Sequence, residues 1–213
     1  MTSRYHDTPR NEILPYVPER CARVLEFGCG TGATISAIRT HRSVEWAGGL
    51  ERDAGAAERA RAVLDRVWEG DAETSTFDRD IAAASLDLVL CLDVLEHLVD
   101  PWTMVTRIAG LLAPGGRLVI SVPNIRHYKF ISNLFFKGDF HYRDAGLLDR
   151  THLRFFVRDT AIDLATRGGL KLVTCDNAHP PKAGDMRWLM SKLSAGGLDP
   201  LMTKQYVVVS ANT

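Results

Sequence analysis

A glycine-rich turn between a short apolar run and a helix-forming segment constrains the fold of this 213-residue chain most strongly. The run Arg23–Phe27 ends in the sequence Gly28-Cys29-Gly30-Thr31-Gly32, and Ala33–Arg39 has the composition of a helix. Glycine allows the backbone to turn tightly, and it allows a ligand to approach the main chain where a Cβ atom would obstruct it. The pattern therefore predicts a strand, a ligand-binding turn and a helix.

Apolar runs alternate with helix-forming stretches over the first 122 residues. Further strands are predicted at Val44–Leu50, Val67–Asp71, Leu86–Leu92 and Arg117–Val122, and helices at Arg52–Val67 and Asp93–Leu112. The strands are continuous apolar runs, which is typical of parallel strands covered on both faces. Their order predicts a Rossmann-like, doubly wound α/β domain.

The segment 123–158 interrupts this order, because it is rich in His, Tyr, Phe, Arg and Asp and is too long for an ordinary loop. Regular elements return afterwards, with helices near Asp159–Arg167 and Asp185–Leu193 and strands at Leu170–Cys175 and Gln205–Ser210. We expect residues 1–213 to form one domain, with an N-terminal cap over 1–20 and a substrate-facing insertion over 123–158.

Composition excludes several classes of protein. The chain has 26 basic residues (Lys and Arg) and 26 acidic residues (Asp and Glu). This balance argues against nucleic acid as the main partner. The four cysteines have no metal-ligand spacing, so neither a metal site nor a disulfide framework is predicted. Neither a secretory signal nor an apolar stretch of about 20 residues is visible, so a cytoplasmic protein without a membrane span is expected.

Two details of the turn indicate a cationic ligand. A dinucleotide site has the pattern G-x-G-x-x-G, with helix amides directed at a pyrophosphate, whereas here Gly32 comes one residue sooner. Glu26 precedes the turn, and its carboxylate would repel a pyrophosphate but attract the ammonium and sulfonium groups of S-adenosylmethionine (SAM). Alternatively, Glu26 is a solvated or capping residue.

Two more acids are predicted at strand ends, where α/β sheets bind ligands. Glu51 follows the second strand, where a carboxylate can accept hydrogen bonds from both ribose hydroxyls. Asp71 ends the third predicted strand, where it could reach the adenine amine or cap the next segment.

Five segments resemble the motif series of class I SAM-dependent methyltransferases: Val24–Gly32, Gly49–Glu51, Gly70–Asp71, Asp93–Leu98 and Leu112–Gly116. The resemblance, which runs from about Pro9 to Val122, implies a sheet of seven strands, mostly parallel with an antiparallel last strand. It also implies that Cys91–His97 lies along SAM. The residues predicted to bind SAM, and its product S-adenosylhomocysteine, are Glu26, Gly28, Cys29, Gly30, Gly32, Glu51, Arg52, Asp71, Ala72, Cys91, Asp93 and His97.

The insertion resembles the corresponding part of bacterial methyltransferases of polysaccharide and other glycan biosynthesis, and more weakly the methyltransferase-fold accessory proteins of methionine biosynthesis. These likenesses imply methyl transfer to an oxygen or nitrogen of a small polar or glycan-linked acceptor, or a non-catalytic accessory protein that binds a partner enzyme. A nicotinamide-dependent oxidoreductase is disfavoured by Glu26 and the early Gly32. The polar stretch Lys182–Thr203 is a candidate for a homodimer surface or for part of the acceptor pocket.

Histidines of the insertion are the candidate general bases, because a hydroxyl acceptor must lose a proton and imidazole titrates near neutral pH. His152 is the first candidate, followed by His127 and His141. The alternative is that His152 fixes the insertion through hydrogen bonds. His97 either covers the methyl donor or caps a helix.

Overall fold

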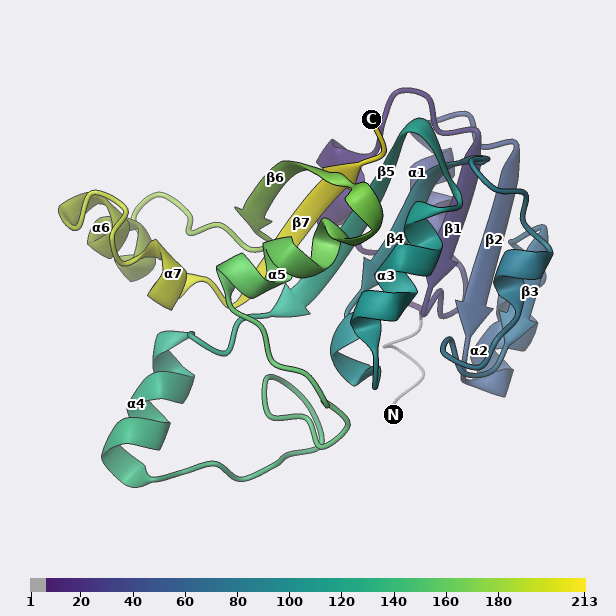
Figure 1. Ribbon diagram of the computed structural model, residues 1–213. Helices are drawn as coiled ribbons and strands as arrows, with labels where there is room; N and C mark the ends of the chain where they lie inside the picture. Colours follow the sequence, from purple (N-terminus) through teal and green to yellow (C-terminus); the bar gives the residue numbers. More distant parts are fainter. Residues whose placement is uncertain (1–6) are drawn as a thin grey trace.

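The computed structural model describes residues 7–213, in which seven strands form one sheet (Figure 1). In chain order the strands are β1 (Arg23–Phe27), β2 (Trp46–Glu51), β3 (Arg66–Glu69), β4 (Leu86–Leu92), β5 (Leu112–Pro123), β6 (Lys171–Asn177) and β7 (Gln205–Ala211). They lie in the order β3-β2-β1-β4-β5-β7-β6, with β1 to β5 paired in parallel. β7 is antiparallel to both β5 and β6. The predicted fold class is confirmed.

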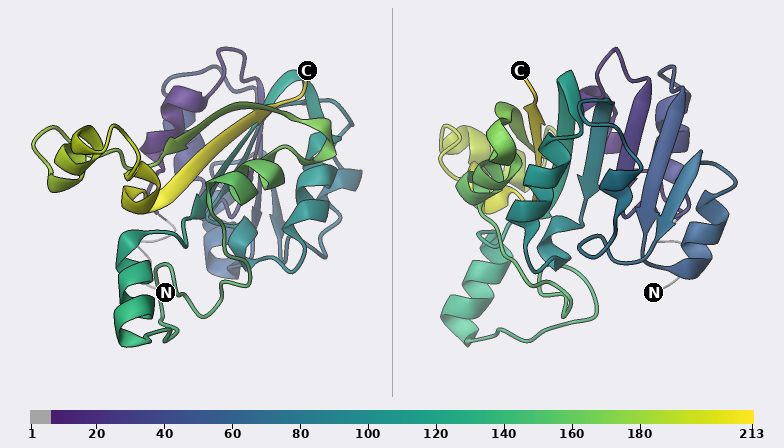
Figure 2. Two further views of the ribbon diagram at one scale, coloured as in Figure 1. Left: turned by 60° about the vertical axis from the view of Figure 1, so that its left-hand side comes forward. Right: turned by 45° about the vertical axis from the view of Figure 1, so that its right-hand side comes forward.

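Helices cover both faces of this sheet (Figures 1 and 2). They are η1 (Asn11–Tyr16), α1 (Ala33–Arg39), α2 (Ala54–Ala60), η2 (Phe77–Arg79), η3 (Leu95–His97), α3 (Pro101–Ala109), α4 (Tyr128–Lys137), α5 (Arg158–Ala165), η4 (Arg167–Gly169), α6 (Met186–Leu193) and α7 (Asp199–Met202), where η denotes a 3-10 helix. One hydrophobic cluster joins the sheet to α3 and α5, and a second joins it to η1, α1 and α2.

Strand β4 shows why the apolar runs are continuous. Its seven residues are all buried, with Val89 and Cys91 in the α3 and α5 cluster and Leu88 and Leu90 in the other. A strand covered on both faces needs apolar side chains at successive positions. β4 is therefore a central strand, and its carboxyl end leads directly into the turn that carries Asp93.

The boundary between α2 and β3 differs from the prediction. The predicted helix Arg52–Val67 ends at Ala60, because residues from Arg66 onwards pair with β2. Helical propensity is thus overridden by tertiary pairing. The prediction that Asp71 ends the third strand is also wrong, because β3 ends at Glu69. The Asp71 carboxylate instead accepts a hydrogen bond from the amide of Glu73 at 2.8 Å and turns the chain.

The predicted helix Asp93–Leu112 is divided into two parts. Asp100 accepts a hydrogen bond from the amide of Thr103 at 3.0 Å, and Pro101 is the first residue of α3. Proline at this position lacks an amide that a helix could not use anyway, and it disfavours helix in the residue before it. Asp93 to His97 consequently form a turn with η3 over the end of β4, rather than the first turns of a long helix.

The insertion contains one helix, α4, that the sequence pattern did not predict. In Figure 1, α4 lies apart from the sheet, on the side of the carboxyl ends of the parallel strands. Only Phe130 of this helix is buried, although the apolar residues Tyr128, Ile131, Leu134 and Phe135 recur at helical spacing. The insertion returns to the body of the protein where the amides of Leu153 and Arg154 donate to the carbonyl of Glu96, at 2.8 and 3.0 Å.

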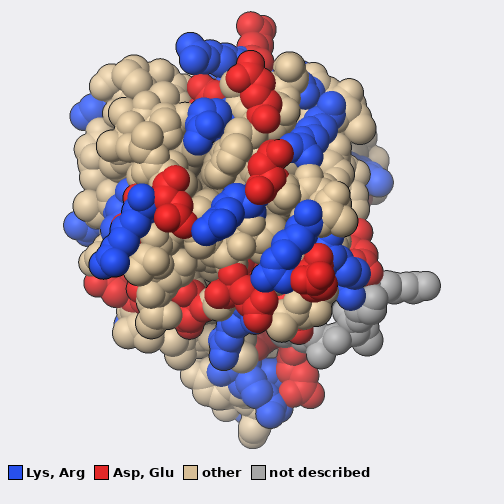
Figure 3. Space-filling model, turned by 90° about the vertical axis from the view of Figure 1, so that its right-hand side faces the viewer, with Lys and Arg blue, Asp and Glu red and all other residues tan. Residues whose placement is uncertain are grey.

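Positive and negative side chains alternate on the face seen in Figure 3. Near β3, Arg61 contacts Glu58 and Glu69, and Arg66 contacts Asp80. Acidic and basic side chains are thus interspersed on this face. Over residues 7–213, none of the helices has the length and hydropathy that crossing a membrane requires.

Gly116 provides a test of the packing between β4 and β5. A Cβ atom at Gly116 would lie 2.6 Å from the carbonyl oxygen of Leu86 and 2.9 Å from that of Ala113, so Gly116→Ala requires the backbone to move. We expect it to lower the free energy of unfolding in urea by roughly 2–4 kcal/mol. Gly115→Ala is the matched control, because it meets no atom within 4 Å and is strained only by its φ of +79°. Its expected cost is about 1 kcal/mol, and equal costs would contradict the packing argument.

Candidate active site

Two cavities open at the carboxyl ends of β1 and β4. The first, of about 440 Å³, lies between the glycine-rich turn and the N-terminal cap. The second, of about 780 Å³, lies between η3 and the insertion. Asp93, His179 and Gln205 line both cavities, so a ligand in one would lie beside a ligand in the other.

The glycine-rich turn is held against the end of β2. The amide of Gly28 donates to the carbonyl of Leu50 at 2.8 Å, and a Cβ atom at Gly28 would lie 2.7 Å from Cγ2 of Val94. Gly28, Gly30 and Gly32 all have positive φ, a conformation that other residues rarely adopt. The turn therefore requires glycine, as predicted, and it exposes backbone toward the first cavity.

Glu26 is a buried acid in the wall of the first cavity. Burial raises its pKa to about 8, and its Oε2 atom has no hydrogen-bond partner within residues 7–213. An unpartnered buried carboxylate oxygen costs free energy, which a cationic ligand in the cavity would recover. This arrangement fits an ammonium group and does not fit a phosphate.

Glu51 ties the glycine-rich turn to the start of α2. One oxygen of its buried carboxylate accepts a hydrogen bond from the amide of Gly30, and the other from the amide of Asp53, both at 2.8 Å. Asp71 is exposed in the turn that follows β3. The contacts predicted between these two acids and the ribose and adenine groups stay predictions.

The other residues predicted to bind SAM differ in their placement. Cys29 and Asp93 line the first cavity, whereas His97 lines the second. Arg52 is exposed, and Gly32 and Ala72 are buried near the strand ends. Cys91 has no exposed surface and packs in the α3 and α5 cluster, so only its backbone could face a ligand.

Arg10 is a site residue that sequence reasoning missed. Its guanidinium reaches from the N-terminal cap to Asp93, with Nη1 2.6 Å from Oδ2, and it also contacts Glu12 at 2.5 Å. Asp93 further accepts hydrogen bonds from the hydroxyl of Ser121 at 3.1 Å and from the side-chain amide of Gln205. No sequence pattern distinguishes Arg10, because its role arises only when the cap folds over the end of β4.

The three candidate bases lie in different surroundings. His152 and His127 line the second cavity, and Nε2 of His127 is buried without a hydrogen-bond partner among the described residues. His141 lines neither cavity. It is exposed, and its Nδ1 lies 2.7 Å from Oδ1 of Asp139. The structure therefore brings two of the three histidines to one cavity.

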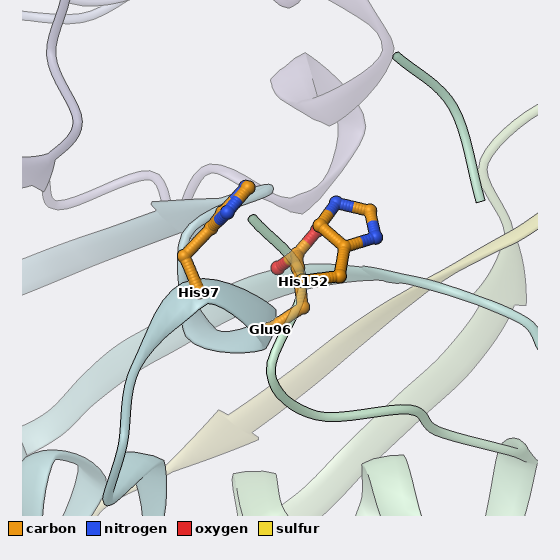
Figure 4. A group of neighbouring side chains, drawn as sticks. All are labelled: Glu96, His97 and His152. Carbon is orange, nitrogen blue, oxygen red and sulfur yellow. The ribbon is translucent and has the colours of Figure 1, made fainter. Parts of the chain in front are cut away.

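His152 lies in a cluster with Glu96 and His97, which we call the Glu96 cluster (Figure 4). Figure 4 shows the Glu96 carboxylate between the two imidazole rings, whose centroids are 4.7 Å apart. Nε2 of His152 lies 4.0 Å from Oε1 of Glu96, and both side chains are almost fully buried. The sequence placed Glu96 near the methyl donor but gave it no role, because nothing in the sequence shows that its carboxylate is buried.

Burial changes the ionisation of this cluster. It raises the pKa of Glu96 well above the usual range of a carboxyl, with the charge of Asp93 adding to the effect. It lowers the pKa of His97, and the neighbouring His152 lowers it further. His97 is therefore neutral at pH 7, with one ring nitrogen available as an acceptor.

A seven-stranded sheet of this order, with a glycine-rich turn and a buried acid at its carboxyl edge, defines a SAM-dependent methyltransferase. The chain belongs to the family described as "Methyltransferase domain", whose model matches residues 2–175. The family and the fold together imply SAM as the cofactor.

Two relatives with named activities are a ubiquinone biosynthesis O-methyltransferase and a trans-aconitate 2-methyltransferase. The chain is 28% identical over 173 residues to a ubiquinone biosynthesis O-methyltransferase of Xanthomonas euvesicatoria, covering 74% of this chain and 71% of the relative. It is 33% identical over 117 residues to a trans-aconitate 2-methyltransferase of Methylobacterium radiotolerans, covering 54% and 44%. These relatives do not show the predicted likeness to methyltransferases of glycan biosynthesis.

Solved structures share the fold. A SAM-dependent methyltransferase from Archaeoglobus fulgidus matches with a TM-score of 0.69 at 15% identity, over 95% of this chain and 92% of the other. A second match, with a TM-score of 0.64 at 18% identity over 98% and 89%, is to a complex of the Haloferax volcanii Trm112 methyltransferase activator and a methyltransferase. At such identities the likeness shows the fold alone.

Proposed function

We propose that this methyltransferase transfers the methyl group of SAM to a hydroxyl oxygen of a small polar acceptor bound in the second cavity. The observation that carries the proposal is that the two cavities meet at Asp93. A donor in the first cavity and an acceptor in the second would then be held side by side, which is most of what an in-line displacement requires. The name of the Xanthomonas relative favours oxygen over nitrogen.

The residues of the first cavity fit the donor. When bound, SAM supplies an activated methyl group. Glu26 has a buried oxygen without a partner, which suits the ammonium group of the donor. Gly28 and Gly30 leave the backbone open to it, and Glu51 and Asp71 are the candidates for its ribose and adenine groups.

The second cavity contains groups that can receive the proton of a hydroxyl. Nδ1 of His152 lies 3.1 Å from the carbonyl oxygen of Leu147, which can only accept a hydrogen bond. Nδ1 therefore carries the hydrogen in the neutral ring, and Nε2 is left as the proton acceptor. His127 also has a free Nε2 in this cavity and is the second candidate. His141 has no comparable support.

Two lysines indicate which acceptors fit. Lys129 and Lys204 line the second cavity, and their positive charges lower the pKa of His127, in addition to the effect of its burial. A carboxylate or phosphate on the acceptor would be attracted to these lysines. The proposal therefore covers small hydroxy acids and also phosphate-bearing sugars, which retains the glycan-linked acceptor as one member of a wider class.

The donor site is tested by calorimetric titration with S-adenosylhomocysteine. We expect the wild type to bind with a Kd on the order of micromolar. Glu51→Ala removes the acceptor of the Gly30 amide and should weaken binding roughly tenfold or more. Glu58→Ala is the matched control, because Glu58 is exposed on α2 and contacts Arg61 instead of the turn. A folded wild type that does not bind S-adenosylhomocysteine would refute the proposal.

The acceptor is tested by release of S-adenosylhomocysteine from SAM in the presence of three probes. They are a hydroxybenzoate, trans-aconitate and a nucleotide-linked sugar. Turnover with the hydroxybenzoate or the sugar is the expected result, and turnover with trans-aconitate alone would move the acceptor atom from a hydroxyl to a carboxylate. Tight binding of S-adenosylhomocysteine without turnover on any probe would favour the non-catalytic accessory protein.

A further inference from the structure

We infer that Glu96, His97 and His152 bind a divalent transition-metal cation, of the class of Zn²⁺, Mn²⁺ or Co²⁺, in the wall of the second cavity. The sequence predicts no metal, because these ligands come from η3 and from the end of the insertion, far apart in the chain. Folding brings one potential ligand atom from each of the three side chains to within 4.8 Å of the others.

The ligand set determines which cation fits. Two imidazoles and one carboxylate favour Zn²⁺, Mn²⁺, Co²⁺ or Fe²⁺ over Mg²⁺ and Ca²⁺, which prefer oxygen ligands. Bonds of about 2.0–2.2 Å require the three ligand atoms to move closer by small side-chain rotations. Three protein ligands leave coordination positions open, and the open side is the second cavity, because all three residues line it.

The hydrogen bonds of both imidazoles leave the nitrogen that a metal needs. Nδ1 of His152 donates to the carbonyl of Leu147, as described above. Nδ1 of His97 lies 3.2 Å from the carbonyl oxygen of Thr151 and 3.0 Å from its hydroxyl, whose hydrogen is directed to Asp149 at 2.7 Å. His97 must therefore also donate from Nδ1. Both rings keep an Nε2 lone pair, oriented by outer hydrogen bonds of the kind that hold metal-binding histidines.

Glu96 is the observation that points most directly to a bound cation. Neither oxygen of its carboxylate has a hydrogen-bond partner among the described residues, although the residue is only 1% exposed. A buried carboxylate of this kind is costly unless it is paired or coordinates a metal. Its backbone carbonyl holds the insertion through Leu153 and Arg154, so the chain next to His152 is fixed to the chain of Glu96.

Other charged groups surround the cluster. Asp93 and Asp149 lie on the same cavity wall, and the Asp149 carboxylate accepts hydrogen bonds from the amide and the hydroxyl of Thr151. These acids increase the negative potential at the cluster and favour a cation. Asp93 already binds Arg10 and Asp149 already accepts from Thr151, so Glu96 is the carboxylate left for the metal.

The role of the cation rests on the proposed function, whereas its binding does not. A cation at this position would bind the acceptor hydroxyl and lower its pKa. The acceptor oxygen then forms its bond to the methyl carbon while its proton passes to water, and the sulfonium becomes a neutral thioether. His152 acts in this arrangement as a ligand and not as the general base.

Cation binding is tested on the full chain after treatment with a chelator. Co²⁺ is titrated by visible absorbance, and Mn²⁺ by electron paramagnetic resonance. We expect one equivalent to bind with a Kd on the order of micromolar, and Glu96→Gln and His152→Asn each to weaken it roughly tenfold or more. His41→Asn is the matched control, because His41 is exposed and lines neither cavity. The absence of binding, or equal binding by all four proteins, would overturn the inference.

Titration of the same samples with S-adenosylhomocysteine shows whether each variant is folded and separates the two proposals. If the chelated protein transfers methyl groups as fast as the metal-loaded protein, the inference about the role of the cation fails and the proposed function stands. If Co²⁺ binds through Glu96 and His152 but the probes are not methylated, the cation site stands and the proposed function fails.

Discussion

His152→Asn is expected to lower the turnover of methyl transfer by roughly 10²- to 10⁴-fold, with little change in the affinity for S-adenosylhomocysteine. The side chain lines the acceptor cavity and not the donor cavity, so the loss should fall on kcat. Asparagine can still donate a hydrogen bond to the carbonyl of Leu147, which preserves the local fold. The measurement is release of S-adenosylhomocysteine with the acceptor that gives the fastest turnover in the panel of probes.

A comparison with the His127→Asn variant decides which of the two histidines supports methyl transfer. His127 lines the same cavity on the side of α4, and a larger loss in this variant would transfer the role to it. Excess Mn²⁺ distinguishes the two chemistries open to His152. Partial recovery of turnover indicates a weakened metal ligand, whereas a loss that Mn²⁺ does not change indicates a missing proton acceptor.

Glu26→Gln is expected to weaken the binding of SAM roughly 100-fold at pH 8 and to remove most of its dependence on pH below that value. The ammonium group of SAM binds the ionised carboxylate, but burial raises the pKa of Glu26 to about 8. Affinity of the wild type should therefore rise with pH from about 6 to 8, by up to roughly tenfold per unit. Above about pH 8 it should fall again, as the amino group of the ligand loses its own proton.

Calorimetric titrations at pH 6, 7, 8 and 9 check this prediction. Glutamine has nearly the shape of glutamate but cannot ionise, so the variant should be almost flat between pH 6 and 7. Glu58→Gln, on the exposed face of α2, should follow the wild type. A wild type whose affinity does not change below pH 8 would mean that Glu26 does not face the ammonium group.

Much of the fold follows from local patterns. β1 and β4 are continuous apolar runs with clear ends, so their positions could be predicted to within a residue. The end of α2 could not, because Arg66 to Glu69 are a strand only through their pairing with β2. Helix α4 was missed because residues 123–158 were treated as one irregular insertion on the basis of their composition, although the apolar residues of α4 recur at helical spacing.

Some residues of the candidate site could likewise be predicted from the sequence, and others could not. Glu26 and Glu51 lie at strand ends, which the order of the elements locates in advance. Arg10 and Gln205 reach Asp93 from opposite ends of the chain, and only the folded sheet brings them together. The Glu96 cluster depends on burial and on the path of the insertion. Neither can be inferred from the order of residues along the chain.

The turn after β4 is attached at both of its ends to segments that are remote in the chain. Its first residue, Asp93, binds Arg10 of the N-terminal cap, and the carbonyl of Glu96 binds the returning end of the insertion at Leu153 and Arg154. The N-terminal cap, which lines the donor cavity, and the insertion, which lines the acceptor cavity, are therefore attached to the same short piece of backbone. We therefore expect a rearrangement of either segment to displace residues that line the other cavity, so that binding in one cavity changes the affinity of the other.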